Sequence, residues 1–357
     1  MREIRYKNFS LKTHKINWRI KRINVCQFEL TFGCGLHCNY CYCDCYNKPR
    51  YLKKELTTGQ VKSLLDKVRD YGIIWLCFTG GDPLTRKDFL EIYSYAKDKG
   101  FIITIFTNGF SMTREIADYL AKSPPFVIEI TLNAITKNVY EQITQVRGSF
   151  KKAIEGIKMI KKRNIPLKIK TMVINENLGQ MPKVKRFIRN LGIKFRPSPY
   201  IHARLNQELT PCDLRIKPEE VFSLDGRKKL RDEDCEKLTD GTGRRLYDKN
   251  PRPNTKLFRC AIGGGDGISI DPYGNIFPCS CIRKPKINLL KEEVKEAQKQ
   301  ILDWVWIQRS SSNGRCSSCS LRKMCFSCPG RAYLETGSLE KPVEWFCELA
   351  HLSTNIH

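Results

Sequence analysis

The sequence has no long apolar run. No stretch approaches the roughly 18 residues of a membrane-spanning helix, and the N-terminal segment MREIRYKNFSLK lacks the apolar core of a signal peptide. Acidic residues are also scarce: 37 stand against 63 basic ones, which leaves a formal charge of +26. We therefore expect a cytoplasmic protein with no membrane segment, and its 357 residues are enough to bury a substantial core.

A basic stripe interleaved with aromatic residues, typical of proteins that bind single-stranded nucleic acid, is not evident either. The lysines are spread along most of the chain instead of forming one block. We interpret the positive charge as a solvated, Lys-rich surface and do not expect a nucleic-acid partner.

Cysteine, by contrast, is abundant, with 17 residues in a chain that shows no export signal. Because the cytosol keeps thiols reduced, metal ligation explains so many cysteines better than a disulfide framework. The clustered cysteines fall in three groups, at positions 34/38/41/43/45, 260/279/281 and 316/319/325/328/347.

The most informative segment is the run TFGCGLHCNYCY, where Cys34, Cys38 and Cys41 are separated by three and then two residues. Three thiolates on a loop that Gly33 and Gly35 allow to curl can hold one cuboidal iron-sulfur cluster. Such a cluster usually takes four protein thiolates, so one iron would be open to another ligand. Two alternatives are a zinc knuckle and a set of buried thiols. Structural zinc, however, needs four ligands.

Between residue 25 and about residue 199, short strand-like runs alternate with longer amphipathic segments. We expect strands at residues 26–31, 73–79, 101–107, 127–132, 167–173 and 193–196. We expect helices at residues 57–72, 85–100, 114–122, 150–163 and 183–191. The alternation predicts an α/β fold with a parallel sheet, whose strands are apolar nearly throughout because both faces are covered.

Candidate catalytic and binding residues gather where the expected strands end, which is where the catalytic groups of such folds lie. The cysteine loop follows the first strand and Asn133 follows the fourth. Between them, the second and third strands are followed by the runs Gly80-Gly81-Asp82-Pro83 and Thr107-Asn108-Gly109.

The cysteine loop and these strand ends resemble the radical S-adenosylmethionine (SAM) superfamily. The resemblance implies a partial (β/α)6 TIM-like barrel and a [4Fe–4S] cluster whose open iron is chelated by SAM. It further implies reductive cleavage of SAM to methionine and a 5′-deoxyadenosyl radical, with Cys34, Cys38 and Cys41 as the cluster ligands.

The resemblance also implies how the other residues contact SAM. Gly80, Gly81, Asp82 and Pro83 match a GGE-type motif, with Asp in place of the usual Glu, that holds the SAM amino group. Thr107 and Asn108 would line the adenosyl pocket. Asn133 would lie beside the ribose, where an acidic residue is common, and Arg147 in QVRGSF would pair with the SAM carboxylate.

The C-terminal cysteines resemble the SPASM extension, which binds one or two auxiliary [4Fe–4S] clusters. By that pattern a distal cluster would be held by Cys316, Cys319, Cys325 and Cys347, and a proximal one by Cys260, Cys279 and Cys328. The fourth proximal ligand stays open between Cys281, Asp266 and a vacant position. A zinc ribbon, the alternative, would use only four of these cysteines.

These motifs divide the chain into an N-terminal extension (1–24), a radical SAM barrel (25–199), a linker or substrate-covering region (200–257) and a SPASM domain (258–357). We assign no role to Cys43 or Cys45. Cys212 and Cys235 are candidate hydrogen-atom donors to a substrate radical, with an incidental structural role as the alternative.

The SPASM resemblance implies an enzyme that modifies a ribosomally made peptide or protein by thioether or carbon-carbon cross-linking, or by epimerisation. About 25 residues precede the first strand, too few for a fused peptide-recognition domain, so we expect a separate leader-peptide-binding partner. An electron donor such as flavodoxin or ferredoxin is a further expected partner.

Three alternatives stay open. The first is an anaerobic sulfatase-maturating enzyme that makes formylglycine, although Ser280 stands where that family has an aspartate base. The second is a radical SAM enzyme that acts on an anionic small molecule such as a porphyrin, and the third is a non-enzymatic iron-sulfur protein that binds nucleic acid.

Overall fold

The computed structural model describes residues 6–19, 23–193, 195–224, 257–258, 260, 267–311, 314–323 and 325–355. Their strands form one nine-stranded sheet with the order β6-β5-β4-β3-β2-β1-β7-β8-β9. Two residues with a sequence-based role, Cys235 and Asp266, lie outside the described residues. No described helix is long and apolar enough to cross a membrane.

The first six strands are parallel neighbours in chain order, which confirms the predicted α/β fold. They are β1 (Val25–Thr31), β2 (Trp75–Gly80), β3 (Ile102–Thr107), β4 (Val127–Thr131), β5 (Leu167–Met172) and β6 (Phe195–Ser198). Phe28, Phe78 and Ile105 are fully buried on the central strands. Because helices cover the sheet, such side chains face no water, and burying each contributes about 1.5–3 kcal/mol.

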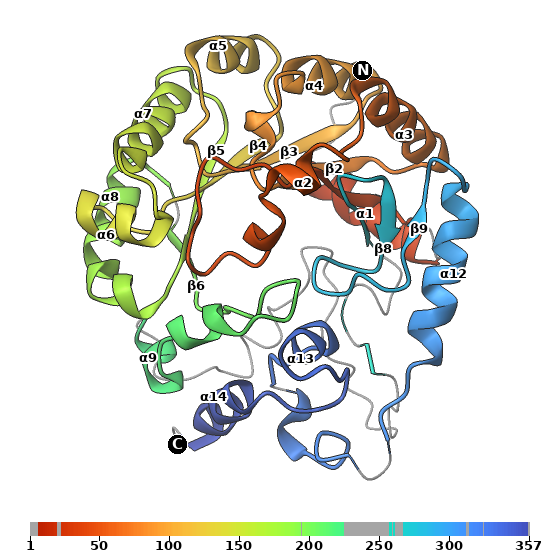
Figure 1. Cartoon of the computed structure of the whole chain (residues 1–357), viewed down its shortest axis with the longest axis vertical. Helices are drawn as coiled ribbons and strands as arrows, with labels where there is room; N and C mark the ends of the chain where they lie inside the picture. The colour runs from red at the N-terminus through yellow and green to blue at the C-terminus, as the bar shows by residue number, and fades with distance from the viewer. Residues whose placement is uncertain are drawn as a thin grey trace.

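An outer arc of helices surrounds this sheet in Figure 1. They are α3 (Thr58–Tyr71), α4 (Phe89–Asp98), α5 (Arg114–Lys122), α6 (Lys137–Thr144), α7 (Ser149–Lys162) and α8 (Met181–Asn190). In α3, a capping box between Thr57 and Gln60 starts the helix, and Gly72 ends it in the left-handed region at φ 104°. The sequence predicted five helices here and missed α6.

Short helical elements connect the longer ones at the ends of the strands. Two follow the cysteine loop, η1 (Asp44–Tyr46) and α2 (Pro49–Leu52), and two more follow β2 and β5, η2 (Pro83–Thr85) and η3 (Asn175–Gln180). After β6 the chain forms η4 (Thr210–Leu214) and α9 (Pro218–Ser223).

The C-terminal segment extends the same sheet. β7 (Gly267–Ile270) pairs in parallel with β1, and β8 (Asn275–Phe277) and β9 (Ile287–Asn288) follow as antiparallel strands. A hairpin turn joins β7 and β8, where the Asp271 carboxylate accepts from the N–H groups of Tyr273 and Asn275 at 2.9 Å each. The sheet thus runs across the boundary predicted at residue 258.

Three helices complete this segment: α12 (Val294–Ile307), α13 (Pro329–Thr336) and α14 (Glu344–Asn355). In Figure 1, α13 and α14 lie across the molecule from α4 and α5, and the cysteine loop with α2 lies between them. The cysteine-rich end of the chain therefore stands over the edge of the sheet where the parallel strands end.

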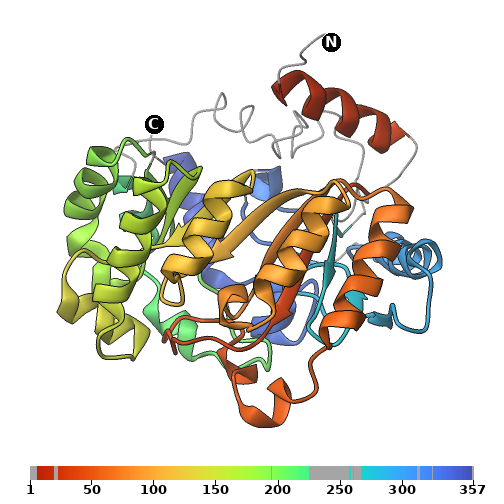
Figure 2. The ribbon, with the colours of Figure 1, turned by 90° about the horizontal axis from the view of Figure 1, so that it is seen from above.

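The N-terminal helix α1 (Tyr6–Arg19) lies outside the row of barrel helices in Figure 2. The Trp75 indole N–H donates to the Tyr6 hydroxyl at 3.0 Å, and the Tyr6 and Phe126 ring centroids are 4.6 Å apart. Trp75 begins β2 and Phe126 immediately precedes β4, so α1 packs at the end of the barrel opposite the cysteine loop.

Candidate iron-sulfur and SAM site

The three predicted cluster thiols lie on the loop that follows β1. Cys34, Cys38 and Cys41 are each partly exposed. The Cys41 N–H donates to the Cys38 carbonyl at 2.9 Å, which closes the second half of the loop into a tight turn. The loop therefore brings the three sulfurs to one place at the C-terminal end of the barrel.

The middle of this loop is fixed to the C-terminal end of α6. His37 and Asn39 donate their N–H groups to the carbonyls of Thr144 and Ile143, at 3.0 Å each. The last turn of a helix leaves its carbonyls without helical partners, and the loop uses two of them.

Asn47 holds the start of the loop. Its Oδ1 accepts the Cys34 N–H at 3.2 Å, and its Nδ2 donates to the carbonyls of Cys34 and Leu36 at 3.1 and 3.4 Å. One amide side chain thus bonds to both the N–H and the carbonyl of Cys34, a predicted ligand, and holds the backbone from which its thiol projects.

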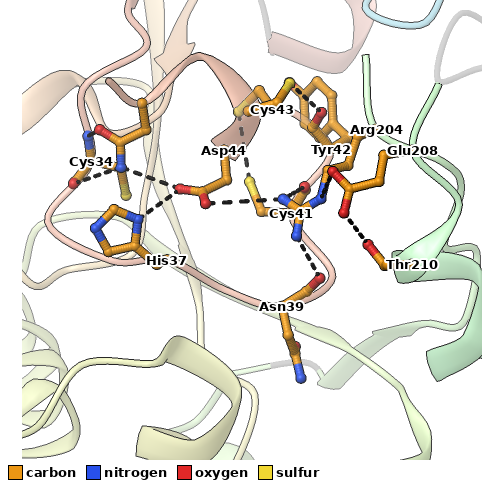
Figure 3. Close-up of polar contacts among 12 residues, drawn as sticks. Cys34, His37, Asn39, Cys41, Tyr42, Cys43, Asp44, Arg204, Glu208 and Thr210 are labelled. Atoms are coloured by element: carbon orange, nitrogen blue, oxygen red, sulfur yellow. Dashed lines mark hydrogen bonds and ion pairs between the residues drawn. The ribbon is translucent and has the colours of Figure 1, made fainter. Parts of the chain in front are cut away.

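Arg204, from the segment after β6, holds the far end of the loop, as Figure 3 shows. Its guanidinium donates to the carbonyls of Cys41 and Asn39 at 3.0 and 3.3 Å and pairs with the Glu208 carboxylate at 3.4 Å. On the other side of the loop, His37 Nδ1 lies 3.1 Å from the Asp44 carboxylate. The loop is therefore held by side chains from both ends.

The two glycines after β2 pack directly against the cysteine loop. A Cβ on Gly80 would lie 2.0 Å from the Thr31 carbonyl oxygen, and one on Gly81 would lie 2.4 Å from that of Gly33. Gly80 also has φ 135°, a value that disfavours side chains. No larger residue fits either position, so these glycines permit the close contact between the two loops.

Asp82 is fully buried, and its carboxylate contacts the loop after β3. It accepts from the Thr107 hydroxyl at 2.7 Å and from the Asn108 N–H at 2.9 Å, while its other oxygen accepts the Leu84 N–H at 3.0 Å. Burial raises the pKa of Asp82, and these three donors oppose that shift. Asp82 therefore links the two predicted SAM-binding loops.

Asn108 connects this network to the cluster ligands. Its side-chain amide donates to the Cys34 sulfur at 3.3 Å, and its oxygen accepts the Phe110 N–H at 2.8 Å. Hydrogen bonds to ligand sulfurs are among the groups that set a cluster's reduction potential.

The chemistry of the thiols fits iron ligation. Burial raises the pKa of Cys34 and of Cys38, whereas a hydrogen bond from the Cys43 thiol lowers that of Cys41. A buried thiol ionises only where a positive charge compensates it, and coordination to iron supplies that charge. Three sulfurs from one loop, one of them with an amide donor, suit a cluster that keeps one iron free of protein ligands.

Cys43 and Cys45, to which the sequence assigned no role, follow the three predicted ligands directly. The Cys43 sulfur is buried, 3.7 Å from both the Cys41 sulfur and the Gly80 carbonyl. The Cys45 thiol lies 3.9 Å from the Tyr42 carbonyl. Cys43 thus contacts a predicted ligand, which the spacing alone did not indicate.

Asn133 and Arg147 differ in their placement. Asn133 is buried, and its amide donates to the Tyr40 hydroxyl at 2.7 Å and accepts the Met172 N–H at 3.0 Å. Arg147 is exposed in the turn between α6 and α7. The ribose contact of Asn133 and the carboxylate contact of Arg147 stay predictions, and the structure shows that the Asn133 side chain is already engaged by protein groups.

Four predicted distal ligands border one cavity of about 260 Å³, many times the ~10–15 Å³ that one water needs. They are Cys316, Cys319, Cys325 and Cys347. Burial raises the pKa of Cys347 to about 11, with Cys325 and Cys316 close enough to add to the shift. Among the described residues no three side chains converge as around a single metal ion. In an iron-sulfur cube, by contrast, each protein thiolate binds a different iron, so the thiols need not converge on one ion.

A buried ion pair joins the C-terminal segment to the barrel. Arg283 makes two contacts of 2.7 and 2.8 Å with the Glu29 carboxylate, which is 1% exposed at the middle of β1. The Tyr42 hydroxyl donates to the same carboxylate at 3.5 Å. Tyr42 is next to Cys41, so this pair ties the cysteine loop, the first strand and the C-terminal module together.

The segment after β6 makes a second connection between the two regions. Besides the Arg204 contacts, its Leu205 N–H donates to the Tyr42 carbonyl at 2.9 Å. Toward the C-terminal module, Arg215 forms an ion pair with Glu335, and the Ile216 carbonyl accepts the Trp345 indole N–H at 2.9 Å. The described part of the predicted linker is therefore a fixed bridge.

The residues that sequence reasoning missed are those that position ligands: Asn47, Arg204, His202 and Arg283. Each acts on a segment far from it in sequence or outside any motif. No spacing signal in one sequence marks such a residue, because its role exists only after the chain has folded.

Comparisons with known proteins agree with this geometry. Residues 28–188 match the family described as the Radical SAM superfamily. An AdoMet-dependent heme synthase from Methanosarcina barkeri is 24% identical over 330 residues, which cover 87% of this chain and 92% of that protein. A PqqA peptide cyclase from Bradyrhizobium diazoefficiens is 26% identical over 329 residues, which cover 87% of this chain and 82% of that protein.

Among solved structures, Streptococcus suis SuiB bound to its precursor peptide SuiA superposes with a TM-score of 0.69. The match covers 92% of this chain and 77% of that one at 16% identity. At this identity the likeness shows a shared fold, which includes the cysteine-rich C-terminal segment.

Proposed function

Because residues 28–188 match the Radical SAM superfamily, we propose that the chain uses the 5′-deoxyadenosyl radical to modify a ribosomally made peptide or protein. The observation that carries the proposal is the cysteine loop itself. Its three thiols follow β1, its backbone packs against the glycine loop after β2, and its Cys34 sulfur accepts from the Asn108 amide. When bound there, the cluster supplies the electron that cleaves SAM.

The chain's own residues would hold the two reactants in place. Asn47 and Arg204 fix the ligand loop from its two ends, while Asp82 fixes the loops that would contact the SAM amino group and adenosine. Holding reacting groups in one geometry is a large part of how enzymes lower a barrier. The C-terminal module, which stands over the same end of the barrel, would cover the substrate and exclude water (Figure 1).

Two of the similar proteins support a peptide as the substrate. One is a peptide cyclase and the other was solved with its precursor peptide bound. A cross-link between two residues would remove a pair of hydrogen atoms. The adenosyl radical would take one of them, and the other would leave as a proton and an electron. Auxiliary clusters held by the C-terminal cysteines would supply an acceptor for that electron.

A second candidate is an anionic tetrapyrrole, and two observations favour it. The match to the heme synthase covers 92% of that protein. The chain also carries a formal charge of +26, which would attract propionate groups. In this case the radical would act on a carboxylate-bearing side chain of the ring.

The experiment that separates the candidates offers both substrates to anaerobically reconstituted protein with SAM and dithionite. One is a short peptide encoded beside the gene, and the other is an iron porphyrin that carries carboxylate side chains. We expect 5′-deoxyadenosine release to rise with the peptide and its mass to fall by two hydrogens. Epimerisation would instead leave the mass unchanged in water and add deuterium in D₂O. A mass loss in the porphyrin with an inert peptide would overturn the proposal in favour of the second candidate.

A further inference from the structure

Four cysteines of the C-terminal module lie close together, although only three were predicted ligands of the proximal cluster. Cys260 and Cys328 border one cavity. Cys328 directly precedes α13, and Gly330 of that helix packs against Cys281. Cys279 is two residues before Cys281 in the chain, so the four cysteines surround one region.

We propose that Cys281 is the fourth protein ligand of the proximal auxiliary cluster, together with Cys260, Cys279 and Cys328. The proposal rests on the chain being a cluster-bearing radical SAM enzyme, but on no particular substrate. It closes the position that the family pattern left open, since Asp266 stands where some relatives have a cysteine.

The backbone of Cys281 is held on two sides. Cys279 and Ile282 form an isolated antiparallel bridge, and the Ile282 N–H donates to the Cys279 carbonyl at 2.9 Å. On the other side, a Cβ on Gly330 would fall 2.8 Å from the Cys281 Cβ. Gly330 lies in the first turn of α13, directly after Cys328 and Pro329. The tight turn and the close helix therefore place Cys281 between Cys279 and Cys328.

His202 marks the point toward which Cys281 faces. Its Nε2 lies 3.7 Å from the Cys281 sulfur, and its Nδ1 lies 2.9 Å from the Ala203 carbonyl. Its ring packs 5.5 Å, centroid to centroid, from that of Tyr42. The contact with the Ala203 carbonyl fixes the orientation of the His202 ring.

Four thiolate ligands would leave no iron of this cluster open to a substrate sulfur. The proximal cluster would then act in electron transfer and not in substrate binding. Tyr42, which follows the ligand Cys41, packs against His202, which faces Cys281. These two rings therefore connect the two predicted cluster sites.

The test measures iron content and EPR spectra in a background that lacks Cys34, Cys38 and Cys41, so that only auxiliary clusters form. In that background Cys281→Ala is expected to lose about half of the cluster iron, or to leave a three-iron cluster with an EPR signal in the oxidised protein. Cys77→Ser is the matched control, and we expect it to change neither readout. If Cys281→Ala does not fold, Cys281→Ser should retain the iron but shift the EPR signal of the reduced cluster, because an oxygen replaces the sulfur.

Two companion variants identify a rival ligand. Loss of iron in Asp266→Ala or in His202→Ala, with Cys281→Ala unchanged, would overturn the proposal in favour of that residue. In the background protein that lacks Cys34, Cys38 and Cys41, an EPR signal that shifts when 2-mercaptoethanol is added would also overturn it, because a fully ligated cluster has no open iron. None of these readouts involves SAM or a substrate, so their failure is distinct from a failure to find a peptide product.

Discussion

The two cysteine regions of this molecule are organised in different ways. In the N-terminal loop, side chains that are not ligands hold the backbone: Asn47 at Cys34, Arg204 at Cys41 and the end of α6 in between. In the distal C-terminal site, the four cysteines border a cavity of about 260 Å³ between short elements such as η5 (Ser320–Lys323). Side chains outside the predicted ligand set therefore anchor the first site, whereas the second is built from short elements around a cavity. Where a site is not preformed, the free energy of metal binding becomes free energy of folding.

The largest expected effect separates activity from stability. Replacing Cys34, Cys38 and Cys41 together by Ala should reduce 5′-deoxyadenosine release to background, because no cluster can bind SAM. The melting temperature should change little, since the loop is held without the metal. Replacing Cys316 and Cys347 by Ala should instead lower the melting temperature by roughly 5–10 °C. Anaerobic calorimetry and product chromatography measure the two effects, and equal melting shifts in both variants would break the comparison.

The next effect concerns the ion pair that joins the regions. Arg283→Met should lower the free energy of unfolding by about 3–5 kcal/mol, because it leaves the Glu29 carboxylate buried without its partner. The control is the double variant Glu29→Gln with Arg283→Met, which removes both charges and should recover most of the loss. If the double variant is no more stable than Arg283→Met, the pair does not act as described.

The same variant should have a characteristic pH dependence. Burial raises the pKa of Glu29 even beside Arg283, and removing the guanidinium raises that pKa further. The folded state then holds a proton that the unfolded state releases above a pKa of about 4.3, so stability falls as pH rises from there through the folded pKa. Urea titrations should therefore show a larger deficit for Arg283→Met near about pH 8 than near about pH 5.

A smaller effect is expected at Asn47. Asn47→Ala removes one acceptor and two donors from the loop backbone, at about 1 kcal/mol each, and should slow SAM cleavage by roughly tenfold or more. Asn47→Asp retains the acceptor for the Cys34 N–H and should lie between Asn47→Ala and the parent protein. A rate for Asn47→Ala equal to that of the parent would show that iron binding alone orders the loop, as expected only for the distal site.

The smallest effect is electronic. Asn108→Ala removes the donor to the Cys34 sulfur, which stabilises the more negative reduced cluster, so the midpoint potential should become more negative. The loss of about 1 kcal/mol corresponds to a several-fold slower release of 5′-deoxyadenosine. Redox titration followed by EPR measures the shift, and Asn108→Gln, which retains an amide donor, should show less of it. An unchanged potential in Asn108→Ala would remove Asn108 from the list of tuning groups.

Much of the fold could be predicted because buried parallel strands are apolar without interruption. The runs around Phe28, Phe78 and Ile105 mark β1, β2 and β3, and the helix predicted at residues 114–122 has the bounds of α5. The pairing of β7 with β1 was not predicted, because strands so far apart in sequence carry no local signal of their pairing. Helix α12 was missed too, since its apolar residues are interspersed with lysines and glutamates.

The site divides in the same way. Cysteine spacing and glycine pairs are local patterns, so the ligand loop and the loop after β2 could be predicted. The roles of Asn47 and Arg204 could not be predicted, because each depends on a backbone carbonyl of the cysteine loop that only the folded chain brings close. Asp82 was predicted as a support for SAM, and its bonds to Thr107 and Asn108 show a support that acts through a neighbouring loop.

The position of β7 has a consequence for how the protein is made. β1 is the first strand of the barrel, and its outer side pairs with residues 267–270, which follow the whole barrel in the sequence. While the ribosome is still adding those residues, β1 presents a row of unsatisfied amide groups that another extended chain can join. A fragment truncated before Gly267 should therefore aggregate during expression. Co-expressing a chaperone that shields exposed strand edges should raise the yield of such a fragment more than that of the full-length chain.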